Sequence, residues 1–170
     1  MAHSVSLSCL NELDTGGVVA LARRLTMDMV PCSFWGLDQQ AVDALIMHPN
    51  KLTIVASIED QVVGIGVLAR GESYQRHLGE LSVAVCPSQR RQGIAKSILS
   101  DLVSHAQVLG IDILKALVWT ENHPSRQLFE ALGFEHRATL YGEFKSPEFG
   151  VMDDCVYYKT IPANRLERSL

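Results

Sequence analysis

Short stretches that are apolar, or apolar at every second residue, recur along the chain and predict β-strands. The segment 52–69, LTIVASIEDQVVGIGVLA, holds two apolar runs around the polar pair Glu59-Asp60, which predicts a hairpin. The other predicted strands are 5–9, 80–85, 113–119, 136–144 and 152–161. Strands are therefore expected in both halves of the chain.

Apolar residues at helical spacing separate these strands. In the first half, a helix that Asp14 or Thr15 caps is predicted to run to about Met29. A second helix is predicted to begin after Asp38, which can cap it, and to stop at Pro49. Both helices lie between the first predicted strand and the hairpin.

The second half of the chain holds two further predicted helices. One runs from about 93 to 109 and ends before a glycine. Its apolar stripe comprises Ala95, Ile98, Leu99, Leu102 and Ala106. The other has Pro124 in its first turn and runs to Leu132. A hairpin early in the chain and strand–helix–strand crossovers later predict an α+β fold.

The composition narrows the class of protein. With 170 residues, 47% of them hydrophobic, the chain is expected to form one domain over residues 1–170. The formal net charge of −4 gives no global basic field, so nucleic acid is not an expected partner. The apolar run at 62–69 is too short to span a bilayer, so no membrane contact is expected.

The cysteines and histidines suggest neither disulfides nor a metal site. The four cysteines form no C-x-x-C pair, and the six histidines show no H-E-x-x-H spacing. The amino-terminal MAHSVSLSCLNELD lacks the basic and apolar regions of a signal peptide. Reduced thiols and a cytoplasmic location are therefore expected.

The stretch 89–99, QRRQGIAKSIL, places cations and a glycine where a helix is predicted to begin. The first N–H groups of a helix have no intrahelical partner and lie at the positive end of its dipole, so they attract anions. Gly93 allows a ligand to approach the backbone, while Arg90, Arg91 and Lys96 suit phosphate oxygens. The alternative is a solvated basic helix start without a ligand.

Two common phosphate motifs do not fit this stretch. In the fragment GIAKS, a P-loop would need glycine where the chain has Ala95, and its earlier glycine falls at Arg90. No predicted strand is followed by G-x-G-x-x-G, which a dinucleotide-binding unit requires. If the stretch binds phosphate, it therefore follows another pattern.

The segment from Val85 to Ala95, V-x-P-x-x-R-R-Q-G-I-A, resembles the signature of the GNAT superfamily of acetyl-CoA-dependent N-acetyltransferases. The core motif of that family, Arg/Gln-x-x-Gly-x-Gly/Ala, is matched by Arg90, Gly93 and Ala95. The segment 121–134, ENHPSRQLFEALGF, resembles the second block of the family. The two blocks occur in the family's order, so the chain is identified as a member.

The resemblance implies a single GNAT-type domain. Its central sheet would be mixed but mostly antiparallel, with helices on both faces and splayed strands that hold acetyl-CoA as co-substrate. The implied reaction moves an acetyl group to a primary amine of a small molecule or a peptide by direct attack. Acetylation of protein N-termini and a non-catalytic acyl-CoA-binding or sensing domain are the alternatives. Many family members dimerise, so the resemblance also allows a homodimer.

The resemblance further implies which residues hold the cofactor. In the family the strand before the loop holds the pantetheine arm and the thioester carbonyl, and the loop amides hold the pyrophosphate. The positions that match are Val83, Ala84, Val85, Arg90, Arg91, Gln92, Gly93, Ile94, Ala95, Lys96 and Asn122. Asn122 corresponds to an asparagine that contacts the cofactor arm, although it can equally be a local turn or helix cap.

An amine must lose a proton before it attacks a thioester. Glu80 is the first candidate base, because it opens the cofactor strand and several family members use a carboxylate there. An ordinary strand-end carboxylate is the alternative. His77 and His123 are weaker candidates, and His77 can equally be an ordinary loop histidine.

The expected general acid is missing. Many family members carry a tyrosine in the second-block helix, and the matching residue here is Phe129, which can only pack. Tyr141 in the next strand, or water, can protonate the leaving thiolate instead.

The acceptor pocket is the least specified part of the sequence. An apolar wall is expected within 27–36, MDMVPCSFWG, from Met27, Met29, Phe34 and Trp35, with Asp28 as a possible amine anchor. The alternative is that these side chains belong to the core. The segment 143–154, EFKSPEFGVMDD, is expected to be a late loop whose acids can be a solvated face.

Overall fold

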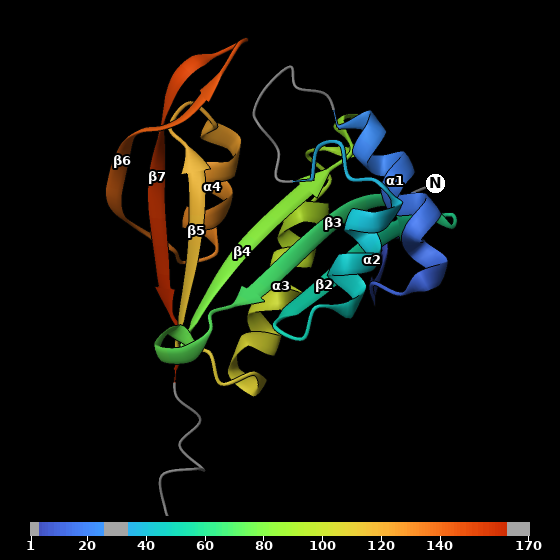
Figure 1. Ribbon diagram of the computed structural model, residues 1–170, viewed down its shortest axis with the longest axis horizontal. Coiled ribbons are helices and arrows are strands. Elements are labelled where there is room, and N and C mark those ends of the chain that lie inside the picture. The colour runs from blue at the N-terminus through green and yellow to red at the C-terminus, as the bar shows by residue number, and fades with distance from the viewer. Residues whose placement is uncertain (1–3, 26–33, 163–170) are drawn as a thin grey trace, which may run out of the picture. The chain divides into compact units, whose positions relative to one another are not determined.

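The computed structural model describes residues 4–25 and 34–162 (Figure 1). Seven strands are hydrogen-bonded in the order β1-β2-β3-β4-β5-β7-β6 and form one mixed sheet, which confirms the α+β prediction. In the described ranges no helix is both long and apolar enough to cross a membrane. The chain divides into two compact units, a first unit of Met1–Ala69 with Leu81–Leu102 and a second unit of Arg70–Glu80 with Val103–Leu170.

Three strands of the first unit form an antiparallel sheet. Strand β1 (Ser6–Cys9) pairs with β2 (Lys51–Ile58), and β2 pairs with β3 (Gln61–Arg70). The predicted hairpin is confirmed, since Glu59 and Asp60 connect β2 to β3 with φ of 48° and 62°. Positive φ at both central residues is the geometry of the tight hairpin turn whose twist matches that of the strands.

Helix α1 (Thr15–Arg24) is shorter than predicted. Leu25 is already extended, with φ −74° and ψ 97°, so the expected continuation to Met29 is wrong at its start, and Met29 itself lies outside the described residues. Val18 and Leu21 are buried, and they give the helix its apolar face. The prediction overextended the helix because the apolar residues after Leu25 continue the spacing without a helix-stopping residue.

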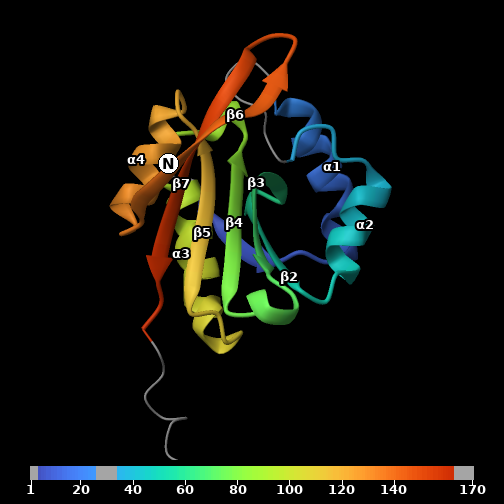
Figure 2. The same ribbon diagram turned by 60° about the vertical axis from the view of Figure 1, so that its left-hand side comes forward.

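Helix α2 (Gln39–Met47) begins and ends as predicted. The carboxylate of Asp38 accepts a hydrogen bond from the backbone N–H of Ala41 at 2.9 Å, which is an N-cap. The helix stops before Pro49, since the residue preceding a proline disfavours helical backbone. Helices α1 and α2 lie side by side in the first unit (Figure 2).

Close packing places helix α3 (Ile94–Val108) on β3. A Cβ atom on Gly66 would lie 2.4 Å from Cγ2 of Ile98, and one on Gly64 would lie 2.9 Å from Cδ1 of the same side chain. Only glycine therefore lets the helix approach this closely. The predicted apolar stripe is confirmed at Ile98, Leu99, Leu102 and Ala106, which are fully buried, whereas Ala95 is half-buried.

The second unit holds the carboxyl-terminal strands. Strand β5 (Ile113–Trp119) pairs antiparallel with β7 (Gly150–Thr160), and β7 pairs antiparallel with β6 (Glu135–Ser146). Strand β4 (Leu78–Val85) pairs in parallel with β5 through its first three residues. Helix α4 (His123–Ala131) lies between β5 and β6 in the chain.

The predicted late loop at 143–154 is wrong. Strands β6 and β7 extend into it from both sides, and only residues 147–149 lie outside them. The connection is short because the hydroxyl of Ser146 accepts a hydrogen bond from the N–H of Phe149, and Gly150 follows with φ of 70°. The charged composition suggested a loop, although a paired hairpin tolerates charges on its exposed face.

Candidate functional site

The loop after β4 is held at its start by backbone contacts within the first unit. The N–H of Cys86 donates to the carbonyl of Val63 at 2.8 Å, and residues 87–89 form a short 3₁₀ turn. The Nε of Arg90 donates to the carbonyl of Val85 at 3.2 Å. Arg90, which the sequence assigned to a phosphate, therefore also ties the loop back to its strand.

The loop ends in two residues with left-handed backbone. Arg91 has φ of 62° and Gly93 has φ of 80°. The first helical bond of α3 runs from the N–H of Ser97 to the carbonyl of Gly93 at 3.0 Å. The amides of 94–96 therefore precede the first intrahelical bond and lie at the positive end of the dipole.

Space for an anion remains beside these amides. A Cβ atom built on Gly93 meets nothing within 4 Å. Arg91, Gln92 and Lys96 are exposed, while Ile94 is buried and anchors the turn. Bare backbone, unpaired amides and nearby cations fit a pyrophosphate, which is the part of coenzyme A that the sequence analysis placed here.

Strand β4 leads into this loop with a partly paired edge. Its parallel pairing with β5 covers only Leu78–Glu80, opposite Ile113–Lys115. Val83 is half-buried, whereas Ala84 and Val85 are buried. The residues that the sequence analysis assigned to the pantetheine arm thus follow the point at which this pairing ends.

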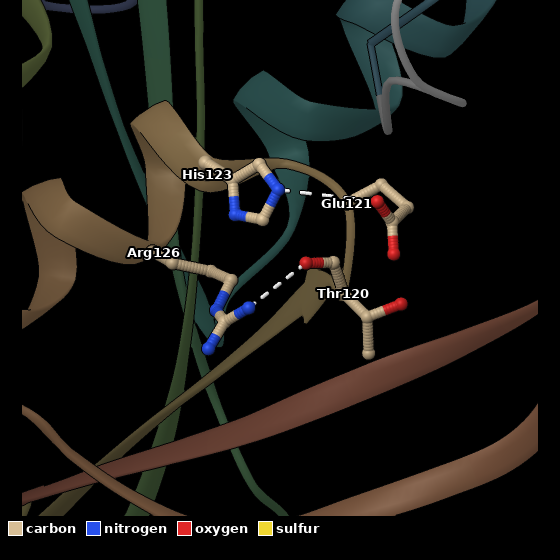
Figure 3. Close-up of polar contacts among 4 residues, drawn as sticks. All are labelled: Thr120, Glu121, His123 and Arg126. Carbon is tan, nitrogen blue, oxygen red and sulfur yellow. Dashed lines mark hydrogen bonds and ion pairs between the residues drawn. The ribbon is translucent and has the colours of Figure 1, made fainter.

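Asn122 caps helix α4 in the second unit. Its side-chain oxygen accepts a hydrogen bond from the N–H of Ser125 at 3.3 Å, which is the capping role that the sequence left open. Next to it, Nη1 of Arg126 donates to the carbonyl of Thr120 at 3.0 Å (Figure 3). The turn from β5 into α4 is therefore held from both sides of Asn122.

The candidate bases lie in exposed positions. The carboxylate of Glu80 lies 3.3 Å from Nζ of Lys115 on β5, and its side chain is 47% exposed. His77 is exposed, and its backbone carbonyl accepts bonds from 112 and 113. Nε2 of His123 lies 3.9 Å from the carboxylate of Glu121, with both side chains exposed (Figure 3). Among these groups Glu80 is the one on a sheet strand.

Phe129 packs in the core, as expected for a residue that cannot donate a proton. It is 3% exposed, and its ring lies 5.2 Å from that of Phe134 and 6.4 Å from that of Tyr157. The alternative acid, Tyr141, is 84% exposed on β6. Position 129 therefore offers no proton donor for the leaving thiolate.

A partly buried polar network that the sequence analysis missed lies beside Phe129, and only Tyr157 in it is fully buried. Nε of Arg126 donates to the hydroxyl of Tyr157 at 3.2 Å, and that hydroxyl donates to Glu130 at 2.8 Å. Burial raises the pKa of Tyr157, while the hydrogen bond to Tyr157 raises the pKa of Arg126. The i, i+4 spacing of Arg126 and Glu130 on one helix face was the available signal.

The proposed acceptor wall is only partly described. Met27, Asp28 and Met29 lie outside the described residues. Phe34 is buried, so core packing accounts for it, whereas Trp35 is 55% exposed. The expectation of a solvated acidic face in 143–154 is wrong for Asp154, which is 3% exposed, because β7 carries it into the sheet.

Several solved structures share this fold at low sequence identity. An acetyltransferase of the GNAT family from Streptococcus pneumoniae is 19% identical, with a TM-score of 0.83 over 93% of this chain and 100% of that chain. A putative acetyltransferase, yncA, from Salmonella typhimurium, solved with its cofactor acetyl-CoA, is 18% identical, with a TM-score of 0.81 over 95% and 96%. A ribosomal-protein-alanine N-acetyltransferase from Brucella melitensis is 25% identical, with a TM-score of 0.80 over 92% and 99%.

A family model gives the assignment its basis in sequence. The model of the acetyltransferase (GNAT) family matches residues 22–134. That range contains the 90–96 loop, the α3 start and the Asn122 turn, which are the features that the geometry singles out. With more than half of its length matched, this chain belongs to the GNAT family of acetyltransferases, and it is an acyltransferase.

Proposed function

We propose that this chain moves an acetyl group from acetyl-CoA to a primary amine of a small molecule or a peptide, by direct attack of the amine. The start of α3 carries the proposal, because it combines unpaired amides with the open space over Gly93. The presence of acetyl-CoA in the Salmonella structure of the same fold supports it.

Each part of the proposed cofactor site has its own role. The amides of 91–96 and the side chains of Arg91 and Lys96 would hold the pyrophosphate, while Arg90 shapes the loop. The backbone of 83–85 would hold the pantetheine arm, while Asn122 caps α4. Acetyl-CoA supplies the acetyl group as an activated thioester.

The chain must then supply a proton acceptor. An alkylamine with a pKa near 10.4 is protonated at pH 7, and the neutral form costs about 4.6 kcal/mol. We propose Glu80 as the base, with an approaching ammonium group displacing Lys115 from its carboxylate. The departing thiolate, with a pKa near 8.5, needs only about 2 kcal/mol of help, which water or Tyr141 can provide.

Acetylation of protein N-termini is the second candidate. The ribosomal-protein-alanine N-acetyltransferase of Brucella melitensis, at 25% identity, favours it. An α-amino group has a pKa near 7.8, so deprotonation at pH 7 costs only about 1 kcal/mol. A peptide acceptor would therefore depend much less on Glu80 than an alkylamine would.

Thiol release from acetyl-CoA tests the proposal directly. The purified chain is offered a panel of alkylamines and of peptides with free N-termini, and the product masses are measured. Release that depends on an amine, with an acetylated product, is the expected result. Tight binding of coenzyme A without any acetylated product would instead identify an acyl-CoA-binding or sensing domain.

A further inference from the structure

Asp154 is a buried carboxylate without a partner in the second unit. It lies on β7 and is 3% exposed. Among the described residues, no side chain or backbone N–H forms a hydrogen bond or ion pair with its carboxylate, whose oxygens keep some contact with solvent, since Thr53 Oγ1 is the one fully buried side-chain polar atom there without a partner. Burial raises the pKa of Asp154, and the nearby carboxylates of Glu143 and Asp153 raise this pKa further.

Aromatic side chains share the sheet face of Asp154. In the register of β5 and β7, Trp119 is the direct partner of Asp154, so the two side chains point to the same face. The ring of Phe149, from the turn between β6 and β7, lies 5.2 Å from the ring of Trp119. Opposite Asp154 on β6 stands Leu140. The carboxylate is therefore bordered by apolar and aromatic groups.

An irregularity in β6 brings a second acid to this place. The pairing of β6 with β7 shifts register between Leu140 and Phe144. Within the shift, Gly142 has φ of 66°, and its N–H donates to the carboxylate of Asp153 at 2.7 Å. Bulges re-aim side chains and are frequent beside functional sites. This bulge contains Glu143, whose charge acts on Asp154.

Folding alone does not account for this arrangement. A buried carboxylate without a donor destabilises a protein, and two further acids increase the repulsion. A metal ion is not indicated, since no three of the described His, Cys, Asp and Glu side chains are grouped to hold one. An ammonium group satisfies all the features together, because it donates hydrogen bonds to carboxylates and is attracted to aromatic faces.

The group held at Asp154 is not the amine that reacts. A carboxylate in an apolar site keeps a paired ammonium group charged, whereas the attacking nitrogen must become neutral. Glu80 lies on the same face, because it pairs with Lys115, four residues before Trp119 on β5. At about 3.3 Å per residue, the two carboxylates are about 13 Å apart along the strands. One nitrogen cannot contact both.

We propose that Asp154, with Trp119 and Phe149, binds a second positive charge on the acceptor, so the substrate class is an elongated amine with two cationic groups. This inference rests on the proposed transferase function and names the class of acceptor. The titratable groups whose charges act on Asp154 are Asp153 on β7 and Glu143 on β6. Strand β5 contributes the uncharged Trp119, and its next charge on that face is Lys115.

The test compares octane-1,8-diamine with octylamine as acceptors at pH 7. We expect the kcat/KM of wild type to be about 10- to 100-fold higher for the diamine, which is the usual contribution of a hydrogen bond to a charged group. The difference should lie mainly in KM. Asp154→Asn should bring this ratio close to one. Glu148→Gln, which removes an exposed acid from the same hairpin turn, is the matched control and should keep the ratio. Asp154→Ala serves if the Asn variant does not fold.

The outcomes separate this inference from the proposed function. If wild type turns over both amines with equal kcat/KM, the proposed cation site at Asp154 is overturned, while the proposed transferase function is supported. If wild type acetylates neither amine, the alkylamine acceptor of the proposed function fails, and thermal unfolding with octane-1,8-diamine then tests the cation site by itself. An increase in Tm that Asp154→Asn abolishes would support the cation site, whereas no increase in wild type would overturn it as well.

Discussion

The two charged regions of this chain are built in opposite ways. In the first unit, the loop before α3 offers backbone amides and exposed cations, and its charged groups remain solvated. In the second unit, Asp154 carries one charge into an apolar part of the sheet without a donor. The first region suits an anion through its local geometry, which a short motif can encode. The second depends on burial, which no short motif encodes.

Both regions carry a local cost that a ligand would offset. Arg91 holds a left-handed backbone that disfavours a residue with a Cβ atom by about 1–2 kcal/mol. Asp154 is 3% exposed, and within the described part of the chain its carboxylate gains no hydrogen bond for the hydration it loses. Strain of this kind is concentrated at functional sites in proteins. Because the two costs arise from different residues, mutations can test the two regions separately.

The largest expected effect is on cofactor affinity in the first unit. Gly93→Val places a branched side chain over the amides of α3, and coenzyme A should bind at least about 100-fold more weakly because its pyrophosphate loses the close approach. Calorimetric titration measures the affinity. Gly110→Val is the matched control, since Gly110 also has a positive φ of 67°. A Cβ atom on Gly110 would lie 3.6 Å from its nearest neighbour, Nη2 of Arg70, so it also fits without a clash. Equal affinities in the two folded variants would contradict the loop site.

The next effect concerns Glu80, the proposed base, in the second unit. Glu80→Gln should lower turnover of an alkylamine at pH 7 by about 10- to 100-fold and recover partly at higher pH, where the amine is already neutral. The pH–rate profile is the measurement. Glu135→Gln is the matched control, because Glu135 is also a strand carboxylate in an exposed ion pair, 2.7 Å from Arg137. A profile for Glu80→Gln that coincides with the control would transfer the role to His77.

The leaving group should show a smaller effect. If Tyr141 protonates the thiolate, Tyr141→Phe should slow turnover by no more than about 30-fold, which corresponds to the 2 kcal/mol penalty, with little change in cofactor affinity. Single-turnover kinetics measures the chemical step. The wild-type rate in that experiment would leave water as the proton donor.

Restoring the family tyrosine tests the same point from the core. Phe129→Tyr adds a hydroxyl to a packed aromatic cluster, so we expect a loss of about 1–3 kcal/mol in the free energy of unfolding. If the hydroxyl reaches the sulfur, the change should also restore some rate to Tyr141→Phe. Urea denaturation and the double-variant rate measure the two effects separately.

The smallest effect concerns stability at Asp154. Its pKa is raised in the folded state, so wild type loses stability as pH rises from the unfolded value of about 3.9 through the folded pKa. Asp154→Asn should therefore be more stable than wild type at pH 7, by about 1 kcal/mol, and the gain should vanish near pH 3. Denaturant unfolding at both pH values measures it. A less stable variant at pH 7 would mean that the carboxylate has a structural partner.

Local sequence patterns determined several elements of the fold. The bounds of β5, the turn at Glu59-Asp60 and the Asp38 cap follow from residues within a few positions of each other. The same holds for the apolar stripe of α3. Each depends on spacing or turn chemistry, which the chain carries locally. The segment 143–154 was assigned to the late loop of the family, although most of it lies in β6 and β7.

The sequence by itself therefore determined the family, the loop before α3 and most of the sheet, whereas the tertiary structure decided the polar groups of the second unit. The bond from Arg126 through Tyr157 to Glu130 joins α4 to β7, and Asp154 becomes buried only through the pairing of β7 with β5 and β6. Register and burial arise between segments far apart in the chain. A carboxylate that is solvated in one register is dehydrated in another, and its chemistry changes with it.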